Sequence, residues 1–364
     1  MDNTRIDEKR RKFLGASVVA VSGVAIVGAG LTIPKQASAQ TRTSAGLAVI
    51  GRADTGNILV ERVTYVSRDA QTKIVGNLFK PADFDPGKKY AAIVVTHPIG
   101  GVKEQTAGLY ALKLAEQGFI TLAYDASYQG ESGGEPHLLE LPTARVSDIS
   151  DSIDYLSRHP QVDPNRIGSL GICGGGGYAL NAAQTELRVK AVATVSAADI
   201  GDLRRNGLAN SRSYEERVKL LQDASAQRTR EAAGEPVRLT PTVPETDNFT
   251  TSTPVMYREG YEYYRTARGQ HPNSPGRSVF SGLPAQMAFF AFEQLETISP
   301  RPVLMIAGAN ADSLYFSEDA YKKAKEPKEL FLVPGATHID MYDRPQHVTP
   351  AVAKLQEFFT RNLI

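Results

Sequence analysis

Short apolar runs recur along most of the chain, and each is bounded by polar or turn-forming residues. They lie at 90–96, 119–124, 166–172, 189–196, 302–307 and 329–333. Their continuous apolar character, without polar alternation, is typical of strands that are buried on both faces of a parallel sheet. We therefore expect each run to be a strand of one central sheet.

Longer segments with apolar residues at helical spacing separate these runs. They span 105–117, 144–158, 317–325 and 349–362. Strands that alternate with helices form βαβ units with right-handed crossovers. Two further β-rich stretches, 61–67 and 72–79, are separated by a polar turn and indicate an antiparallel hairpin that opens the fold. The pattern predicts an α/β fold class with a doubly wound, mostly parallel β-sheet.

A long stretch at 198–300 interrupts the alternation of strands and helices. It contains two segments of helical character, 214–230 and 256–268, on either side of a loop rich in Pro and Thr. An insertion at this point would lie over the carboxyl ends of the strands, so we expect a helical cap that shapes a substrate pocket. We expect its tyrosines to pack on the sheet rather than contact substrate, and for its phenylalanines both roles are open. These residues are Tyr257, Tyr261, Tyr263, Tyr264, Phe289, Phe290 and Phe292.

Composition and charge narrow the class of protein. The 364 residues are 41% hydrophobic and 22% charged, as in globular proteins with a large core. The formal net charge is +1, and no basic run lies beyond the first dozen residues, so we expect no nucleic-acid partner. The single cysteine excludes an intrachain disulfide and a cysteine-cluster metal site, and the six histidines lack metal-site spacing. We expect no metal and no other cofactor.

Residues 1–39 are typical of a twin-arginine signal peptide. The pair Arg10-Arg11 precedes an apolar run, and Ala37-Ser38-Ala39 forms a small-residue cleavage site. We expect the twin-arginine export machinery to be a partner of the precursor, and the mature protein to be periplasmic or secreted. An uncleaved membrane anchor is the alternative, but the apolar run is short and rich in Gly, Ala and Ser. A flexible leader at 40–59 is expected to precede a single domain at 60–364.

The only cysteine lies between a predicted strand and a predicted helix, in the run Gly171-Ile-Cys173-Gly-Gly175. This G-x-C-x-G pattern is typical of a nucleophile elbow, whose strained backbone requires neighbours with little or no side chain. A lone cysteine is more often a small buried hydrophobe, but the glycines and the strand-to-helix position favour a nucleophile here. The helix that begins at Gly174 would direct its amide dipoles at Cys173 and favour the thiolate.

A cysteine nucleophile needs a base, and in this type of fold an acid and then a histidine follow the nucleophile along the chain. His338 follows the last predicted strand, where the base is expected. Asp312 follows the preceding strand and would hold the imidazole in one tautomer and stabilise its charged form. Asp199, after the strand at 189–196, and Glu318, at the start of a predicted helix, are the other candidates for the acid.

Backbone N–H groups are expected to hold the oxyanion that forms when an acyl group is attacked. One should come from Gly174, directly after the nucleophile. The other should come from the loop His97-Pro-Ile-Gly-Gly101, where Ile99 and Gly100 are both candidate donors. Glycines allow a close approach in this loop, although an ordinary strand-to-helix turn would also contain them.

These motifs together resemble those of the α/β-hydrolase superfamily, in particular the dienelactone-hydrolase-like proteins, whose elbow also carries a cysteine. The resemblance covers residues 60–364 and rests on the elbow, the 97–101 loop, the run 124–132 and the run Pro334-Gly-Ala-Thr-His338. It implies an α/β-hydrolase fold with a helical cap insertion. It also implies a triad in which Cys173 is the nucleophile, His338 the base and Asp312 the acid.

Other parts of the resemblance bear on residues outside the triad. Asp125, in the 124–132 run, is expected to be structural and to accept hydrogen bonds from loop amides. Pro98 stands where dienelactone hydrolases carry a glutamate, and their compact domain lacks a cap of this length. Dienelactone itself is therefore not the expected substrate.

We expect an exported hydrolase that cleaves a carboxylic ester or a related acyl bond through a Cys-His-Asp triad and an acyl-enzyme intermediate. Its partner would be a small-molecule acyl substrate. Acyl transfer on the same triad is one alternative, because nucleophiles other than water can capture an acyl-cysteine. A non-catalytic binding protein on a hydrolase fold is another, because an exported thiol is open to oxidation.

Overall fold

The computed structural model describes residues 56–364, and the predicted signal peptide and most of the predicted leader lie outside these residues. One sheet of eight strands has the order β1-β2-β4-β3-β5-β6-β9-β10. The strands are β1 Leu59–Ser67, β2 Thr72–Lys80, β3 Tyr90–Thr96, β4 Ile120–Asp125, β5 Val162–Ile172, β6 Val189–Val195, β9 Val303–Gly308 and β10 Lys328–Val333. All the strands predicted from apolar runs are confirmed, with ends shifted by up to four residues.

The strand directions match the predicted mixed arrangement. β1 and β2 form the opening hairpin, with Leu59 opposite Lys80 and Ser67 opposite Thr72. β2 also pairs antiparallel with β4, and every other neighbouring pair in the sheet is parallel. The sheet is therefore doubly wound and mostly parallel, as the alternation of apolar runs and amphipathic segments predicted.

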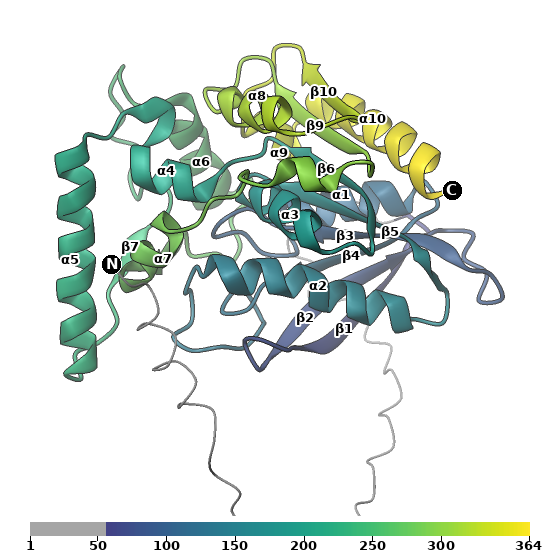
Figure 1. The fold of residues 1–364 in the computed structure, drawn as a ribbon, viewed down its shortest axis with the longest axis horizontal. Helices are drawn as coiled ribbons and strands as arrows, with labels where there is room; N and C mark the ends of the chain where they lie inside the picture. Colours follow the sequence, from purple (N-terminus) through teal and green to yellow (C-terminus); the bar gives the residue numbers. More distant parts are fainter. Residues whose placement is uncertain (1–55) are drawn as a thin grey trace, which may run out of the picture. The chain divides into compact units, whose positions relative to one another are not determined.

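Helices cover both faces of the sheet (Figure 1). They are α1 Thr106–Ala115, α2 Pro142–Arg158, α3 Gly174–Thr185, α8 Leu314–Lys323, α9 Asp340–Asp343 and α10 Pro345–Leu363. Helices α1 and α10 pack on one face with Ile93 and Val95, whereas α2, α3 and α8 pack on the other with Ala92 and Val94. Successive residues of β3 thus enter opposite cores, which explains why the central strands are apolar at every position.

The segment between β6 and β9 forms the elements that cover the elbow end of the sheet. They are α4 Ile200–Asn206, α5 Tyr214–Ala232, β7 Leu239–Pro241, α6 Val255–Arg265, β8 Arg277–Val279 and α7 Leu283–Met287. Figure 1 shows α4, α5, α6 and α7 gathered on the left of the view, away from α10. The two long helices were predicted. The β7-β8 pair was not, because strands of three residues are too short to carry a periodic pattern.

The parallel strands end at one edge of the sheet, and the predicted site residues follow those ends. His97 comes directly after β3 and Cys173 directly after β5, while Asp312 follows β9 and His338 follows β10. Segments separated by up to 241 positions are thereby brought to one place, as is usual for sites in open α/β sheets. None of the helices in residues 56–364 is both long enough and apolar enough to cross a membrane.

Candidate active site

Cys173 lies at the apex of a strained turn between β5 and α3. Its φ is 55° and its ψ is −126°, a backbone conformation that residues with side chains rarely adopt. A Cβ atom added to Gly171 would lie 2.1 Å from the carbonyl oxygen of Gly175, and one added to Gly175 would lie 2.4 Å from that of Thr96. The glycines that the sequence places around Cys173 therefore have a steric cause, which is the close approach of three backbone segments.

Three polar groups form hydrogen bonds with the sulfur of Cys173. They are the backbone N–H groups of Gly174 and Ile99, which donate to it, and the hydroxyl group of Tyr342, whose oxygen can accept the thiol proton. Two amides that converge on one point are what an oxyanion site requires. The alternative donor, Gly100, is not among them, and its carbonyl oxygen accepts a hydrogen bond from Ser274 Oγ at 2.5 Å.

The thiol of Cys173 is not the stabilised thiolate that the helix N-terminus led us to expect. Burial raises the pKa of Cys173 above its ordinary value, although hydrogen bonds from Tyr342, Gly174 and Ile99 act in the opposite direction. Loss of water around the sulfur thus outweighs these hydrogen bonds. The thiol is neutral at rest, so it would need a base in order to act as a nucleophile.

His338 is fully buried at the end of the loop that follows β10. Its Nδ1 is hydrogen-bonded to Ser313 Oγ at 2.5 Å, and its Nε2 lies 3.4 Å from the hydroxyl oxygen of Tyr342. Burial lowers the pKa of His338 to about 4, so the imidazole is uncharged at neutral pH and can accept a proton. Because Tyr342 contacts both His338 and Cys173, its hydroxyl group connects the base to the thiol.

Tyr342 and Ser313 were missed by the sequence analysis, and each had a weak signal. Tyr342 follows His338 by four positions, which places both side chains on the same side of a helical turn, but tyrosine was not sought as a partner of the pair. Ser313 directly follows Asp312, and only a carboxylate was sought at this position. No periodicity or motif distinguishes either residue from an ordinary packing position.

The expected hydrogen bond between Asp312 and His338 is absent from the described residues, which corrects that part of the prediction. Asp312 Oδ2 accepts a hydrogen bond from Met256 N at 2.9 Å, near the start of α6, and its Oδ1 is buried without a partner. Ser313 takes the place beside Nδ1 instead. The physical reason is that the N-terminus of α6 has unpaired N–H groups, which attract the carboxylate toward the cap.

The two other candidate acids are not bonded to His338 either. Asp199 Oδ1 accepts a hydrogen bond from Asp202 N at 3.0 Å and caps α4, while its Oδ2 accepts one from Ala291 N at 3.3 Å. Glu318 lies inside α8, and within residues 56–364 the imidazole is hydrogen-bonded to Ser313 and Tyr342 instead. Asp199 therefore holds cap elements to the sheet.

A largely apolar pocket opens next to the sulfur. The sheet side contributes Ile99, Cys173, Gly174, Ala198, His338, Ile339 and Tyr342, and the cap contributes Ile200, Leu203, Arg204, Thr242, Val243, Met256, Tyr257, Gly260 and Tyr264. The cap thus shapes the pocket, as its place in the sequence predicted. None of the three phenylalanines of 289–292 lines this pocket, and Phe292 is buried in the core.

The cap tyrosines divide between packing and the pocket. Tyr263 is buried and packs edge-on against Tyr264 and Tyr342, with ring centroids 4.9 Å and 5.2 Å away. Tyr261 packs against Phe249 within the cap. Tyr257 and Tyr264 pack against the core and also line the pocket, so contact with substrate stays open for these two residues. The ring cluster fixes the position of Tyr342 against the cap.

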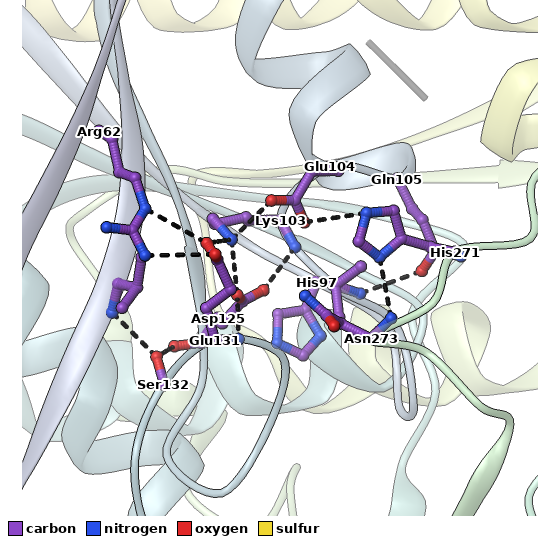
Figure 2. A network of polar contacts seen from close by, with 12 residues as sticks. Arg62, His97, Lys103, Glu104, Gln105, Asp125, Glu131, Ser132, His271 and Asn273 are labelled. Atoms are coloured by element: carbon purple, nitrogen blue, oxygen red, sulfur yellow. Dashed lines mark hydrogen bonds and ion pairs between the residues drawn. The ribbon is translucent and has the colours of Figure 1, made fainter. Parts of the chain in front are cut away.

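A second polar cluster fixes the loop that carries Ile99 (Figure 2). His97 is fully buried, and its Nε2 accepts a hydrogen bond from Ala126 N at 3.1 Å, while its carbonyl oxygen accepts one from Arg145 Nη2 at 2.6 Å. Asp125 accepts hydrogen bonds from Lys103 N and Glu131 N, both at 2.8 Å, which confirms its predicted structural role. These hydrogen bonds indicate that His97 positions the loop rather than acting on the sulfur.

Three acids in this second cluster lie close enough together to suggest a metal site, but a cation is already present. Lys103 Nζ lies 2.6 Å from Glu104, 2.7 Å from Asp125 and 2.7 Å from Glu131. Figure 2 shows the ammonium group among the carboxylates. The lysine supplies the positive charge that a metal ion would otherwise provide, so these residues fit a structural ion-pair network.

Comparisons with known proteins agree with this architecture. Residues 75–199 match the Dienelactone hydrolase family. Uncharacterized protein YcjY from Escherichia coli (strain K12) is 42% identical over 79% of this chain and 93% of its own length. Uncharacterized protein PA2218 from Pseudomonas aeruginosa is 40% identical over 78% of this chain and 76% of its own. The crystal structure of PA2218 has a TM-score of 0.82 and covers 90% of this chain and all of that one.

A more distant solved structure supports the fold alone. The α/β hydrolase GrgF from Penicillium sp. sh18 is 21% identical, with a TM-score of 0.70 over 84% of this chain and 99% of its own. The same family assignment is supported by the strand order, the elbow after β5 and the long match to relatives. The chain is a hydrolase with the α/β-hydrolase fold and belongs to the dienelactone hydrolase family.

Proposed function

We propose that this hydrolase cleaves a carboxylic ester or a related acyl bond through an acyl-enzyme on Cys173. One observation carries the proposal: two backbone amides and the Tyr342 hydroxyl group meet at the sulfur, and Tyr342 also contacts the base His338. The apolar pocket beside the sulfur suits a small acyl substrate. The proposal thus names both the bond that is hydrolysed and the atoms that act on it.

The first half of the reaction forms the acyl-enzyme. The sulfur of Cys173 attacks the acyl carbonyl carbon while the thiol proton passes to the Tyr342 oxygen, and the Tyr342 proton passes to His338 Nε2. The oxyanion accepts hydrogen bonds from the Gly174 and Ile99 amides. The carbon–oxygen bond to the leaving group then breaks, and the leaving alkoxide takes the proton back from the imidazolium along the same route.

The second half releases the acid. Water loses a proton to His338 Nε2 as its oxygen bonds to the acyl carbon, and the carbon–sulfur bond then breaks as the thiolate recovers that proton. Ser313 accepts a hydrogen bond from Nδ1–H in this scheme, which leaves the Nε2 lone pair free to act as base. His338 is uncharged at neutral pH because burial lowers the pKa of His338 to about 4, so its Nε2 is unprotonated before the attack, although a pKa this low also makes the imidazole a weaker base.

Asp312 stays in the proposal as the candidate acid, although it is not a hydrogen-bond partner of the imidazole. Its carboxylate is adjacent in sequence to Ser313, which is bonded to Nδ1, and one of its oxygens has no partner, so its contribution to catalysis is to be tested. Asp312→Asn and Ser313→Ala separate the two contributions. A larger loss of kcat in Asp312→Asn supports the acid role, and a larger loss in Ser313→Ala supports orientation by serine.

The main test uses p-nitrophenyl esters and intact-protein mass spectrometry. Cys173→Ala should abolish turnover without changing the unfolding temperature, and the wild type stopped during turnover should carry the added mass of one acyl group. Unchanged hydrolysis in Cys173→Ala, or the absence of any acyl adduct on a slow substrate, contradicts the proposal. Added alcohols or amines that capture most of the acyl group would indicate acyl transfer, the alternative reaction.

The proposal places the mature protein in the periplasm or outside the cell after twin-arginine export. The pair Arg10-Arg11 and the cleavage site at 37–39 carry this part of it. Replacing both arginines by lysine should leave the full-length precursor in the cytoplasmic fraction, whereas the wild type should be shorter and appear in the periplasmic or medium fraction. Equal fractionation of the two forms contradicts the assignment.

A further inference from the structure

The active-site pocket contains one permanently charged side chain, that of Arg204. All the other lining residues are apolar, hydroxyl-bearing or, in the case of His338, uncharged at neutral pH. Arg204 lies in α4 and is half-buried, and its Nε donates a hydrogen bond to the buried Gln286 Oε1 at 3.0 Å. Charged groups in apolar surroundings are usually paired with an opposite charge, so we looked for an anion that pairs with this guanidinium group.

The residues around Arg204 provide no anion that bonds to it. Within residues 56–364, no carboxylate oxygen lies within ion-pair distance of its guanidinium group, and neither Nη atom donates to a protein acceptor. Glu140 is the carboxylate whose charge reaches Arg204, but it accepts from Tyr178 at 2.8 Å and lies 3.6 Å from Arg145. Burial is the main cause that lowers the pKa of Arg204, which is the direction expected for an uncompensated cation.

A second cavity continues from the same residue. Its lining includes Arg204, Arg212 and Arg238 together with Asp223, whose carboxylate already pairs with Lys219 at 3.2 Å. Arg204 is the residue that both cavities share, so it stands where they border each other. A positive potential therefore extends from the end of the apolar pocket into the cap.

We infer that Arg204 is a specificity-determining residue that binds an anionic group, a carboxylate or a phosphate, on the acyl substrate while the reacting carbonyl lies at Cys173. The inference rests on the proposed function and adds the substrate class: an acyl compound with an apolar body and a negative charge at a distance from the scissile bond. The two free Nη groups of Arg204 offer paired donors, which match the two oxygens of a carboxylate or phosphate.

The anionic group can belong to the acyl chain or to the leaving group, and the two sources are separated by matched probes. The neutral probes are p-nitrophenyl butanoate, hexanoate and octanoate. The acyl-side probes are the mono-p-nitrophenyl esters of succinate, adipate and suberate, which add a terminal carboxylate at each length. The leaving-group probe is 4-nitro-3-(hexanoyloxy)benzoate. At one chain length at least, the wild type should show a kcat/KM for a charged probe about tenfold above its neutral counterpart.

The variants are Arg204→Met, Arg204→Lys and the control Arg228→Met, which removes an exposed arginine of α5 that lines neither cavity. Arg204→Met should lower kcat/KM for the charged probe by about tenfold more than for its neutral counterpart, Arg204→Lys should keep part of the preference, and Arg228→Met should behave as wild type. A wild type that prefers neutral esters, or an Arg204→Met variant that loses both activities equally, overturns the inference.

A binding measurement keeps the inference testable if the esters are not turned over. Adipate should protect Cys173 of the wild type from alkylation by iodoacetamide more than hexanamide does, and Arg204→Met should remove that difference. Equal protection by the two compounds in the wild type overturns the inference. Failure of the proposed function is recognised separately, because Cys173→Ala would then retain neutral-ester hydrolysis.

Discussion

Two buried polar clusters lie beside the same sheet, and burial affects them in opposite ways. Around Lys103, three carboxylates surround one ammonium group at 2.6–2.7 Å, so charge is retained and compensated. Around Cys173 and His338, burial raises the pKa of the thiol and lowers that of the imidazole, so both groups are neutral. The charged cluster holds a loop in place, whereas the neutral cluster keeps protons that can move during a reaction.

The strongest test of the neutral cluster is His338→Gln. Loss of the base should lower kcat by about 10³-fold, because the thiol is protonated at rest and needs a proton acceptor. The measurement is ester hydrolysis at neutral pH, with the unfolding temperature followed in parallel. His347→Gln is the control, because His347 lies 3.9 Å from Asp340 and does not line the pocket. Equal activity in His338→Gln and wild type would exclude His338 as the base.

The matching test of the charged cluster is Lys103→Met. Removing the ammonium group leaves Asp125 and Glu104 buried without their counterion, so the free energy of unfolding should fall by about 3 kcal/mol. Urea denaturation measures it. Lys113→Met is the control, because the exposed pair of Lys113 with Glu116 should contribute less than about 1 kcal/mol. Similar stability losses in the two variants would show that the buried network is not held by charge.

Tyr342→Phe tests whether the neutral cluster works as a connected unit. The ring remains packed against Tyr263, but the contact between His338 and the thiol is lost, so kcat should fall by about 10- to 100-fold with little change in KM. Tyr263→Phe keeps the same ring cluster and should retain activity. If Tyr342→Phe is as active as wild type, His338 reaches the thiol without the tyrosine hydroxyl.

Glu104→Gln gives the smallest effect and concerns the pH dependence of the charged cluster. Burial raises the pKa of Glu104 to about 7 from an ordinary value of 4.5, so the folded state binds an extra proton between these pH values. The stability contributed by that proton is present below pH 4.5 and is lost as the pH rises through 7. The free energy of unfolding of Glu104→Gln relative to wild type should therefore increase by about 1 kcal/mol from pH 6 to pH 7. A constant difference across this range would contradict the shift.

The order of apolar runs was sufficient to predict the sheet, because parallel strands buried on both faces have a sequence pattern unlike that of surface segments. The elbow was predictable for a related reason. Gly171 and Gly175 are required by backbone contacts as short as 2.1 Å, and a requirement of that kind is visible in the sequence itself. The position of His338 followed from strand order and chain order.

The partners of these residues were decided by tertiary structure. Asp312 and Ser313 are neighbours in sequence, and which of them bonds to His338 depends on the start of α6, which comes from the cap and attracts the carboxylate. The protonation state of Cys173 was also decided by tertiary structure. The sequence indicated a thiolate from the helix dipole, but the degree of burial reversed it, and burial depends on packing of the whole cap over the sheet.

The sequence by itself thus determined the succession of strands along the chain, the strained turn at Cys173 and the presence of a cap, because each follows from local sterics or hydrophobic periodicity. Only the tertiary structure decided the order of the strands in the sheet, the place of Tyr342 between Cys173 and His338, the place of Lys103 among three carboxylates, and the position of Arg204 at the pocket. These are long-range contacts between side chains of ordinary type, and their free energy depends on distance and burial, which no local pattern encodes.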